Sequence, residues 1–130
     1  MIEITQNPIL PEAAINGVRK NAYGAVIAYV GTVRDMSHGK KVLCLEHQDS
    51  LKELARKELE RIAGEIQVKW KLDDVVIFHR IGKLRVGEIL LVVAIGAPHR
   101  QEAFEACQYA VDQFKQVAPR WTTEATAEGR

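Results

Sequence analysis

The segment between Pro98 and Pro119 constrains the fold more than any other part of the chain. Proline suits the first turn of a helix and stops a helix that reaches it, and between these two prolines apolar residues recur every three or four positions. These residues are Ala103, Phe104, Cys107, Ala110, Val111, Phe114 and Val117. The pattern predicts a helix over residues 98–117 that packs this whole face, Phe104 included, against the core.

Five shorter apolar runs, bounded by glycine, proline or charged residues, predict β-strands. They cover residues 24–33, 42–47, 68–72, 75–81 and 89–95. Residues 82–87 predict a turn with charged flanks. Because helices and strands do not alternate as regular βαβ units, the sequence predicts an α+β fold with a mainly antiparallel sheet. The 130 residues fit a single domain, whose ends, residues 1–10 and 122–130, are expected to be loop-like or mobile.

Two further helices are expected in the N-terminal half. One begins at Pro11. The other begins near Asp49, where Ser50 and Glu53 fit a capping box, and ends at Gly64. The second helix carries one apolar stripe and one charged face, so it is expected to lie on the surface of the domain.

Charge and composition exclude several classes of function. Lys and Arg number 18 against 17 Asp and Glu, which is not the strongly basic balance of a nucleic-acid-binding domain. No apolar run has the length of a membrane span, and the start of the chain does not resemble a secretory signal, so a cytoplasmic location is expected. Cys44 and Cys107 belong to no metal-ligand pattern, so two reduced thiols and no metal or cofactor are expected.

Cationic residues stand at both ends of the 98–117 helix. His99 and Arg100 fall in its first turn, where the helix dipole already favours an anion. Lys115 falls in its last turn, just before a rigid Ala-Pro-x-Trp sequence whose aromatic residue can partly desolvate an ammonium group. A desolvated lysine can act as an acid, a base or a nucleophile. The segment therefore suggests a site for an anionic small molecule handled by a lysine.

Arginines at the ends of predicted strands add to this set. Arg34 leaves the 24–33 strand and enters a glycine-bounded loop, and Arg80 lies near the end of the 75–81 strand. Together with Arg100 they are the groups that bidentate phosphate binding requires. The sequence does not show whether they converge.

Several short motifs follow one another along the chain in a specific order. They are Gly31-Thr32-Val33-Arg34-Asp35, Leu45-Glu46-His47, His79-Arg80-Ile81-Gly82, Ala97-Pro98-His99-Arg100, and Lys115 followed by Ala118-Pro119 and Trp121. In this order and spacing the sequence resembles the large, catalytic subunit of molybdopterin synthase, the MoaE family. The resemblance extends from Gly24 to Gly129.

The resemblance implies an α/β hammerhead fold with an additional antiparallel sheet, and a homodimer. It also implies a partner, a small ubiquitin-like sulfur carrier of the MoaD type, with which the dimer forms a heterotetramer. The implied reaction belongs to molybdenum cofactor biosynthesis. Two sulfurs are transferred in successive steps, each from the C-terminal thiocarboxylate of a small subunit, to cyclic pyranopterin monophosphate. They form the dithiolene of molybdopterin, with no cofactor or metal.

The roles of site residues in the family carry over to particular positions. Lys115 matches the catalytic lysine of the family, and Arg34 matches its anion-binding arginine. His99 and Arg100 match a His-Arg pair that the family offers across the dimer interface. These four residues are therefore expected to bind the substrate, with Lys115 also catalytic.

The chain departs from the family pattern at one position of the site. Thr122 stands where the family usually has a second lysine, and it supplies a hydroxyl without a charge. By its position it is expected to be the fifth substrate-binding residue. Arg120, two residues earlier, is a candidate to replace that charge. Two alternatives to an active enzyme stay open. One is a catalytically weak member that serves mainly as a binding or scaffold subunit for the small carrier protein, and the other is an unrelated α+β protein that binds a phosphate ligand.

Overall fold

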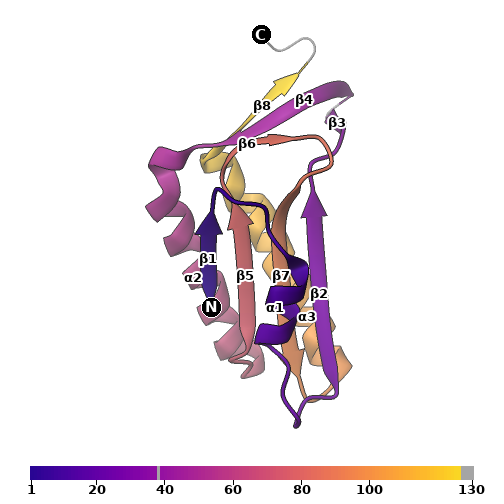
Figure 1. The fold of residues 1–130 in the computed structure, drawn as a ribbon. Coiled ribbons are helices and arrows are strands. Elements are labelled where there is room, and N and C mark those ends of the chain that lie inside the picture. The colour runs from indigo at the N-terminus through magenta and orange to yellow at the C-terminus, as the bar shows by residue number, and fades with distance from the viewer. Residues whose placement is uncertain (38, 127–130) are drawn as a thin grey trace.

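Two β-sheets form the frame of the described part of the molecule (Figure 1). The computed structural model of the chain describes residues 1–37 and 39–126. The first sheet has the strand order β1-β5-β7-β2. Its strands are β1 (Ile2–Thr5), β5 (Val75–Arg80), β7 (Ile89–Ala97) and β2 (Ala25–Thr32). β1 runs parallel to β5, and the other two strand pairs are antiparallel.

The second sheet lies beyond one end of the first, and its strands run across that end (Figure 1). Its strands are β3 (Met36–Ser37), β4 (Lys40–His47), β6 (Gly82–Arg85) and β8 (Thr122–Thr126). β4 lies between β6 and β8, since Leu45 is paired with both Leu84 and Glu124. All of these pairs are antiparallel, so the α+β fold with mainly antiparallel sheets is confirmed.

Helices cover both faces of the first sheet (Figure 1). α1 (Pro11–Gly17) packs on one face, while α2 (Lys52–Trp70) and α3 (Arg100–Val117) pack on the other. Short 3-10 turns, η1 (Asp49–Leu51) and η2 (Ala118–Arg120), precede α2 and follow α3. α3 confirms the long helix expected between the two prolines.

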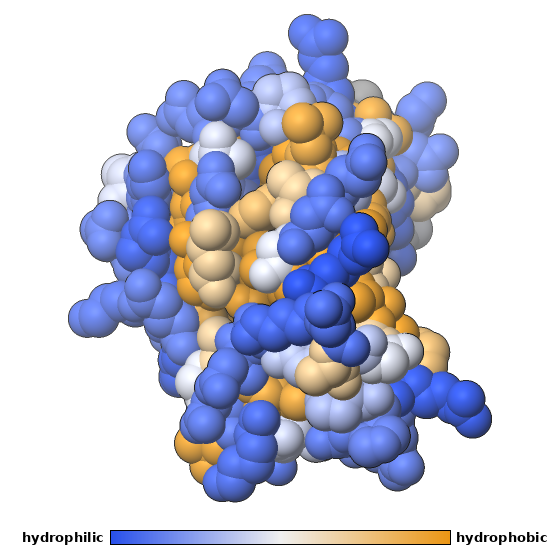
Figure 2. Space-filling model, turned by 60° about the horizontal axis from the view of Figure 1, so that its bottom comes forward, coloured by the Kyte–Doolittle hydropathy of each residue, from blue (hydrophilic) through white to orange (hydrophobic). Residues whose placement is uncertain are grey.

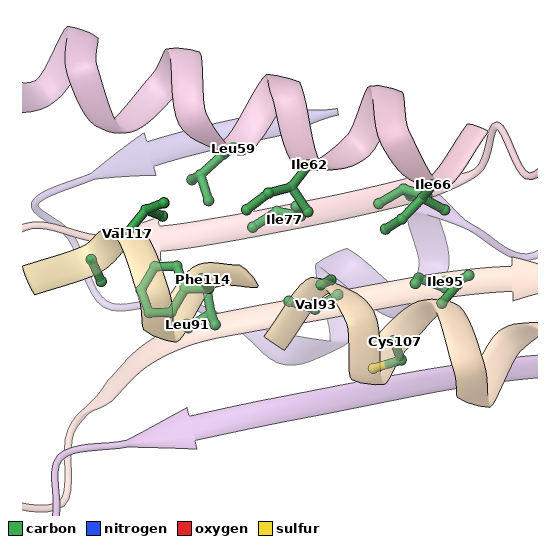
Figure 3. Packing of buried hydrophobic residues seen from close by; sticks show 14 of the residues in the cluster. Leu59, Ile62, Ile66, Ile77, Leu91, Val93, Ile95, Cys107, Phe114 and Val117 are labelled. Carbon is green, nitrogen blue, oxygen red and sulfur yellow. The ribbon is translucent and has the colours of Figure 1, made fainter. Parts of the chain in front are cut away.

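The central strand β7 is apolar along its whole length because it is buried on both faces. Leu91, Val93 and Ile95 belong to the core cluster beneath α2 and α3 (Figure 3). Val92 and Ala94 point the other way, into the cluster beneath α1. The strand expected over residues 89–95 is therefore confirmed, and it lies in the middle of the molecule.

The middle of α2 differs from the sequence prediction. The helix passes through Gly64 and continues to Trp70, and Lys71 ends it in the left-handed conformation at a φ of 59°. The predicted end at Gly64 and the predicted strand over residues 68–72 are therefore wrong. A glycine inside a helix costs about 1 kcal/mol, and the full burial of Ile66, two residues later, outweighs it.

Three smaller expectations are also wrong. The expected capping box of Ser50 and Glu53 does not form. The 3-10 turn η1 leads into α2, and no side-chain hydrogen bond caps the start of the helix. Most of the segment expected as a turn over residues 82–87 is strand β6. The chain ends expected as loops contain β1 and β8, which pair with strands far away in the sequence. Residues 127–130 of the C-terminal end lie outside the described residues.

Phe104 is the exception on the predicted core face of α3. Its neighbours Ala103 and Cys107 are buried, but Phe104 itself is 57% exposed. Figure 2 shows one face of the molecule on which apolar residues gather in the middle, surrounded by hydrophilic ones.

Within residues 1–37 and 39–126, no helix combines the length and the apolarity that crossing a bilayer requires.

Candidate active site

A cavity of about 770 Å³ lies where the end of β2, strand β4 and the C-terminal end of α3 meet. Its lining residues include Arg34 from the segment after β2, Lys115 from the last turn of α3, and Thr122 from the start of β8. Three of the five predicted site residues, distant in the sequence, thus line one cavity. The volume is that of a small-molecule site.

The backbone next to Arg34 is held in place by the turn before β7. The register between β2 and β7 shifts at Gly31 and Thr32, so the strand is irregular where it reaches the cavity. Val33 then donates its N–H to the carbonyl of Glu88 at 3.0 Å and accepts from the N–H of Gly87 at 2.8 Å. These two bonds fix the backbone of the residue before Arg34, so the Arg34 side chain extends from a segment that is held in place.

An irregularity in β4 shapes the apolar floor of the cavity. The pairing of β4 with β8 shifts between Val42 and Cys44, which breaks the regular alternation of side chains along the strand. Val42 and Leu45 both line the cavity although they are three positions apart. Leu90 from β7 lines it too and packs on the same small cluster of buried residues. The floor is therefore apolar, while cations lie along the walls.

The positive charges of Arg34 and Lys115 are not neutralised by neighbours. Both side chains are exposed, and no hydrogen bond or salt bridge joins either of them to another of the described residues. Two cations in one cavity without a carboxylate partner create a positive local potential. Such a cavity favours an anionic ligand.

Thr122 brings a hydroxyl to the same cavity. Its Oγ1 is buried and has no hydrogen-bond partner among the residues that the structure describes. A buried hydroxyl without a partner is uncommon, because losing water without a replacement costs free energy. The hydroxyl thus has an unused donor and acceptor next to the cavity.

His99 and Arg100 lie at the opposite end of α3 and do not line this cavity. The 18 residues of α3 span about 27 Å at 1.5 Å per residue. The His99 side chain is 83% exposed, and its Nδ1 lies 3.5 Å from Glu102 Oε1. Within one chain, the structure does not bring this pair to Lys115.

Two other arginines considered from the sequence are engaged elsewhere. Arg120 Nη1 lies 3.2 Å from a carboxylate oxygen of Glu58 on α2, and Arg120 does not line the cavity. Arg80 forms a salt bridge with Glu88. The structure thus gives no support to Arg120 as the replacement for a second lysine, or to Arg80 as an anion ligand.

The two cysteines do not line the cavity either. Both are free thiols, in agreement with the sequence prediction. Burial raises the pKa of Cys107 to about 11, so this thiol stays protonated at neutral pH. Lys115 supplies an amino group and Thr122 a hydroxyl to the cavity, and neither cysteine supplies a thiol.

Comparison with known proteins agrees with this geometry. A family model described as MoaE protein matches residues 4–117. The chain belongs to the MoaE family. An unrelated phosphate-binding protein, one of the alternatives left open by the sequence, is inconsistent with this membership.

Curated relatives of this MoaE chain cover nearly all of it. It is 39% identical over 127 residues to the molybdopterin synthase catalytic subunit of Bacillus subtilis, across 98% of this chain and 80% of that one. It is 42% identical over 118 residues to the protein of the same name from Pyrococcus abyssi, across 91% and 79%. The crystal structure of molybdopterin synthase from Staphylococcus aureus matches with a TM-score of 0.84 at 33% identity, across 98% and 92%.

The MoaE cavity also has lining residues that sequence reasoning did not predict. Val42, Leu90 and Phe114 contribute to it without belonging to a charged or catalytic pattern. Leu45 stood within a motif of the family, Leu45-Glu46-His47, which was the one available signal for the floor. The apolar lining follows from strand pairing across the second sheet, which a linear pattern does not contain.

Proposed function

We propose that this chain is the catalytic subunit of a molybdopterin synthase in the cytoplasm. It transfers sulfur from the thiocarboxylated C-terminus of a small ubiquitin-like subunit to cyclic pyranopterin monophosphate, and so forms the dithiolene of molybdopterin. The observation that carries this proposal is the cavity that Arg34 and Lys115 line together in a member of the MoaE family.

Arg34 is proposed to bind the phosphate of the pterin. A guanidinium group presents several N–H donors in one plane and can bind a phosphate through two parallel hydrogen bonds. Arg34 has no carboxylate partner among the described residues, so ligand binding breaks no existing salt bridge. Its backbone is fixed through Val33, which limits the entropy lost when the phosphate binds.

Lys115 is proposed as the catalytic residue. Sulfur transfer from a thiocarboxylate requires that its acyl carbon be polarised and that protons move to and from the reacting groups. An ammonium group at the cavity wall can do both. The apolar floor of Val42, Leu45 and Leu90 offers a bound ligand apolar contact beside the lysine.

His99 and Arg100 are proposed to act in the cavity of a second copy of the chain. The length of α3 keeps them away from the Lys115 of their own chain. Phe104 lies one turn further along α3 and exposes 57% of its surface, which suits burial against another protein surface. A homodimer would therefore complete two equivalent cavities, and a small carrier subunit at each would give a heterotetramer.

The second candidate function is a binding or scaffold subunit that docks the small carrier and turns over poorly. The observation that favours it is the single lysine at the cavity wall. Thr122 has no charge, and Arg120 forms its salt bridge with Glu58 on α2. Beside Arg34 and Lys115, the cavity of one chain thus lacks the second lysine that the family usually has at position 122.

Reconstitution tests the proposed function. The purified chain is mixed with the thiocarboxylated small subunit and cyclic pyranopterin monophosphate, and molybdopterin and the small subunit are followed by mass spectrometry. The matched control is the small subunit with an ordinary C-terminal carboxylate. We expect molybdopterin and a desulfurised carrier in the first mixture alone. A stable complex without product would support the scaffold function and contradict the enzyme.

A further inference from the structure

A buried imidazole lies directly behind the wall of the cavity. His79 on β5 has no exposed surface, and both of its ring nitrogens have partners. Its Nδ1 lies 2.9 Å from the carbonyl oxygen of Leu90, and its Nε2 lies 3.0 Å from the indole nitrogen of Trp121. The imidazole therefore joins three segments that are distant in the sequence.

The partners of His79 fix its protonation state. An indole N–H is a donor only, so Nε2 must accept, and the ring proton lies on Nδ1, where it is donated to Leu90. The two bonds point in opposite directions from one rigid ring. They hold Trp121 at a fixed angle to β7, which apolar contact alone would not do, because apolar contact is not directional.

The same ring supports the end of α3. The ring of Phe114 meets His79 edge-on with centroids 5.1 Å apart, and it meets Trp121 at 6.4 Å. Phe114 and Trp121 are buried, at 6% and 1% exposure. The backbone carbonyl of Trp121 also accepts from the N–H of Gln48 at 2.7 Å, so this tryptophan is held at both its side chain and its backbone.

Each residue held by His79 is next to the cavity or in its wall. Leu90 and Phe114 line the cavity themselves. Phe114 directly precedes Lys115, and Trp121 directly precedes Thr122. The position of one buried ring therefore sets the position of both polar groups that α3 and β8 bring to the cavity.

We propose that His79 is a positioning residue of the sulfur-transfer site, which through Trp121 and Phe114 fixes Lys115 and Thr122 in the cavity wall. The inference rests on the proposed function. His79 does not contact the substrate, since it lies behind the wall and outside the lining. Its effect is on the orientation of the catalytic lysine, where an error of about 1 Å can reduce a rate 100-fold.

Three variants separate positioning from simple stabilisation of the core. His79→Phe fills the site and removes both hydrogen bonds. His79→Gln keeps a donor and an acceptor and is the conservative rescue. Trp121→Phe keeps an aromatic ring but removes the indole donor and part of the ring volume, and it carries the test if His79→Phe does not fold. The matched control is Val18→Ala, a fully buried change in the cluster beneath α1, on the other face of the sheet.

The first readout is the kinetics of reconstituted sulfur transfer. We expect His79→Phe and Trp121→Phe to lower kcat about 10- to 100-fold with KM for the pterin changed less than about twofold, and His79→Gln to recover most of kcat. Val18→Ala is expected to lower the free energy of unfolding by an amount similar to that of His79→Phe, while kcat stays unchanged. If His79→Phe folds and keeps the wild-type kcat, the inference is overturned. It is also overturned if His79→Phe and Val18→Ala lower kcat by the same factor.

The second readout does not depend on activity. In a Trp70→Phe background, Trp121 is the remaining tryptophan, so its emission and its quenching by acrylamide report on the buried indole. His79→Phe is expected to shift the emission and increase quenching, and His79→Gln to restore both. Unchanged fluorescence in His79→Phe would overturn the inference, whether or not the wild-type chain transfers sulfur. Absence of product from the wild-type chain would contradict only the proposed function.

Discussion

Lys115 and Thr122 line one cavity from the two ends of a single turn, Lys115 in the last turn of α3 and Thr122 at the first residue of β8. The 3-10 turn η2 between them contains Pro119 and ends beside the buried Trp121. The two side chains therefore approach the cavity at a fixed separation along a rigid segment. A lysine at position 122 would begin from the same wall as Lys115.

The first prediction concerns this position. Thr122→Lys adds an ammonium group where the family resemblance implies a second lysine, and in an active enzyme we expect kcat to change less than about threefold. Arg34 and Lys115 already supply the charges that the proposed mechanism uses. Reconstituted sulfur transfer with saturating carrier and pterin measures the effect. A large gain from a rate near zero would favour the scaffold function.

Thr122→Val is the matched control for that variant, because it keeps the shape and removes the hydroxyl. Thr122 Oγ1 has no partner among the described residues, so the free energy of unfolding is not expected to fall. If the hydroxyl bonds the pterin, KM rises about fivefold, the equivalent of one hydrogen bond of about 1 kcal/mol. Lower stability with an unchanged KM would show that the hydroxyl has a structural partner.

The second prediction tests the shared site. Lys115→Ala and the double variant His99→Ala/Arg100→Ala are each expected to be inactive alone. In a hybrid dimer, one of the two cavities would have Lys115 from one chain and His99 and Arg100 from the other. Co-expression of the two variants is therefore expected to restore about a quarter of wild-type activity, because half of the dimers are hybrid and each has one intact site.

Complementation distinguishes this geometry from a site within a single chain. If His99 and Arg100 acted with the Lys115 of their own chain, every chain in the mixture would carry a lesion, and no activity would return. Separately purified variants that are mixed without subunit exchange serve as the control. Activity confined to the co-expressed sample would support a cavity completed by a second copy.

The third prediction is a pH dependence of stability caused by His79. Burial lowers the pKa of His79 from 6.5 to about 4, so the unfolded chain binds one more proton than the folded chain between these values. Stability is therefore constant above about pH 6.5 and falls as the pH drops toward 4. Between pH 7 and 5 the loss is about 2 kcal/mol, at 1.36 kcal/mol per pKa unit.

Urea unfolding of the wild type and of His79→Gln at both pH values measures this contribution. The variant has no titrating group at the position, so its stability is expected to change less over the same interval. Keeping the measurements at or above pH 5 limits the contribution of carboxylates, whose pKa values are lowered at Glu65, Asp74 and Glu88 and which lose stabilisation at lower pH. An identical loss in both proteins would contradict the assignment to His79.

Local sequence patterns predicted the helices and strands that are stabilised mainly by features of their own residues. α3 has a clear helical period, and β7 has an apolar run that matches burial on both faces. The elements that were missed depend on partners far away in the sequence. β1 pairs with β5, and both β6 and β8 pair with β4. A polar tail or a charged turn contains no signal for such pairing, because the interaction that stabilises it is not local.

The same distinction applies to the site. Arg34 and Lys115 could be identified from short motifs because charge and spacing mark them in the sequence, while Thr122 was identified only through the family resemblance. The apolar floor could not, since the shift in register at Val42 decides which side chains of β4 reach the cavity. His79 stood within a motif of the family, but its link to Trp121 required the structure.

The most direct measurement is single-turnover sulfur transfer by Lys115→Ala with the thiocarboxylated carrier and cyclic pyranopterin monophosphate. Lys57→Ala, which removes an exposed lysine of α2 outside the cavity, is the matched control. The proposed role predicts that Lys115→Ala lowers the rate at least about 100-fold, the usual contribution of a positioned acid or base, while Lys57→Ala keeps the wild-type rate. Formation of molybdopterin by Lys115→Ala at the wild-type rate would contradict it.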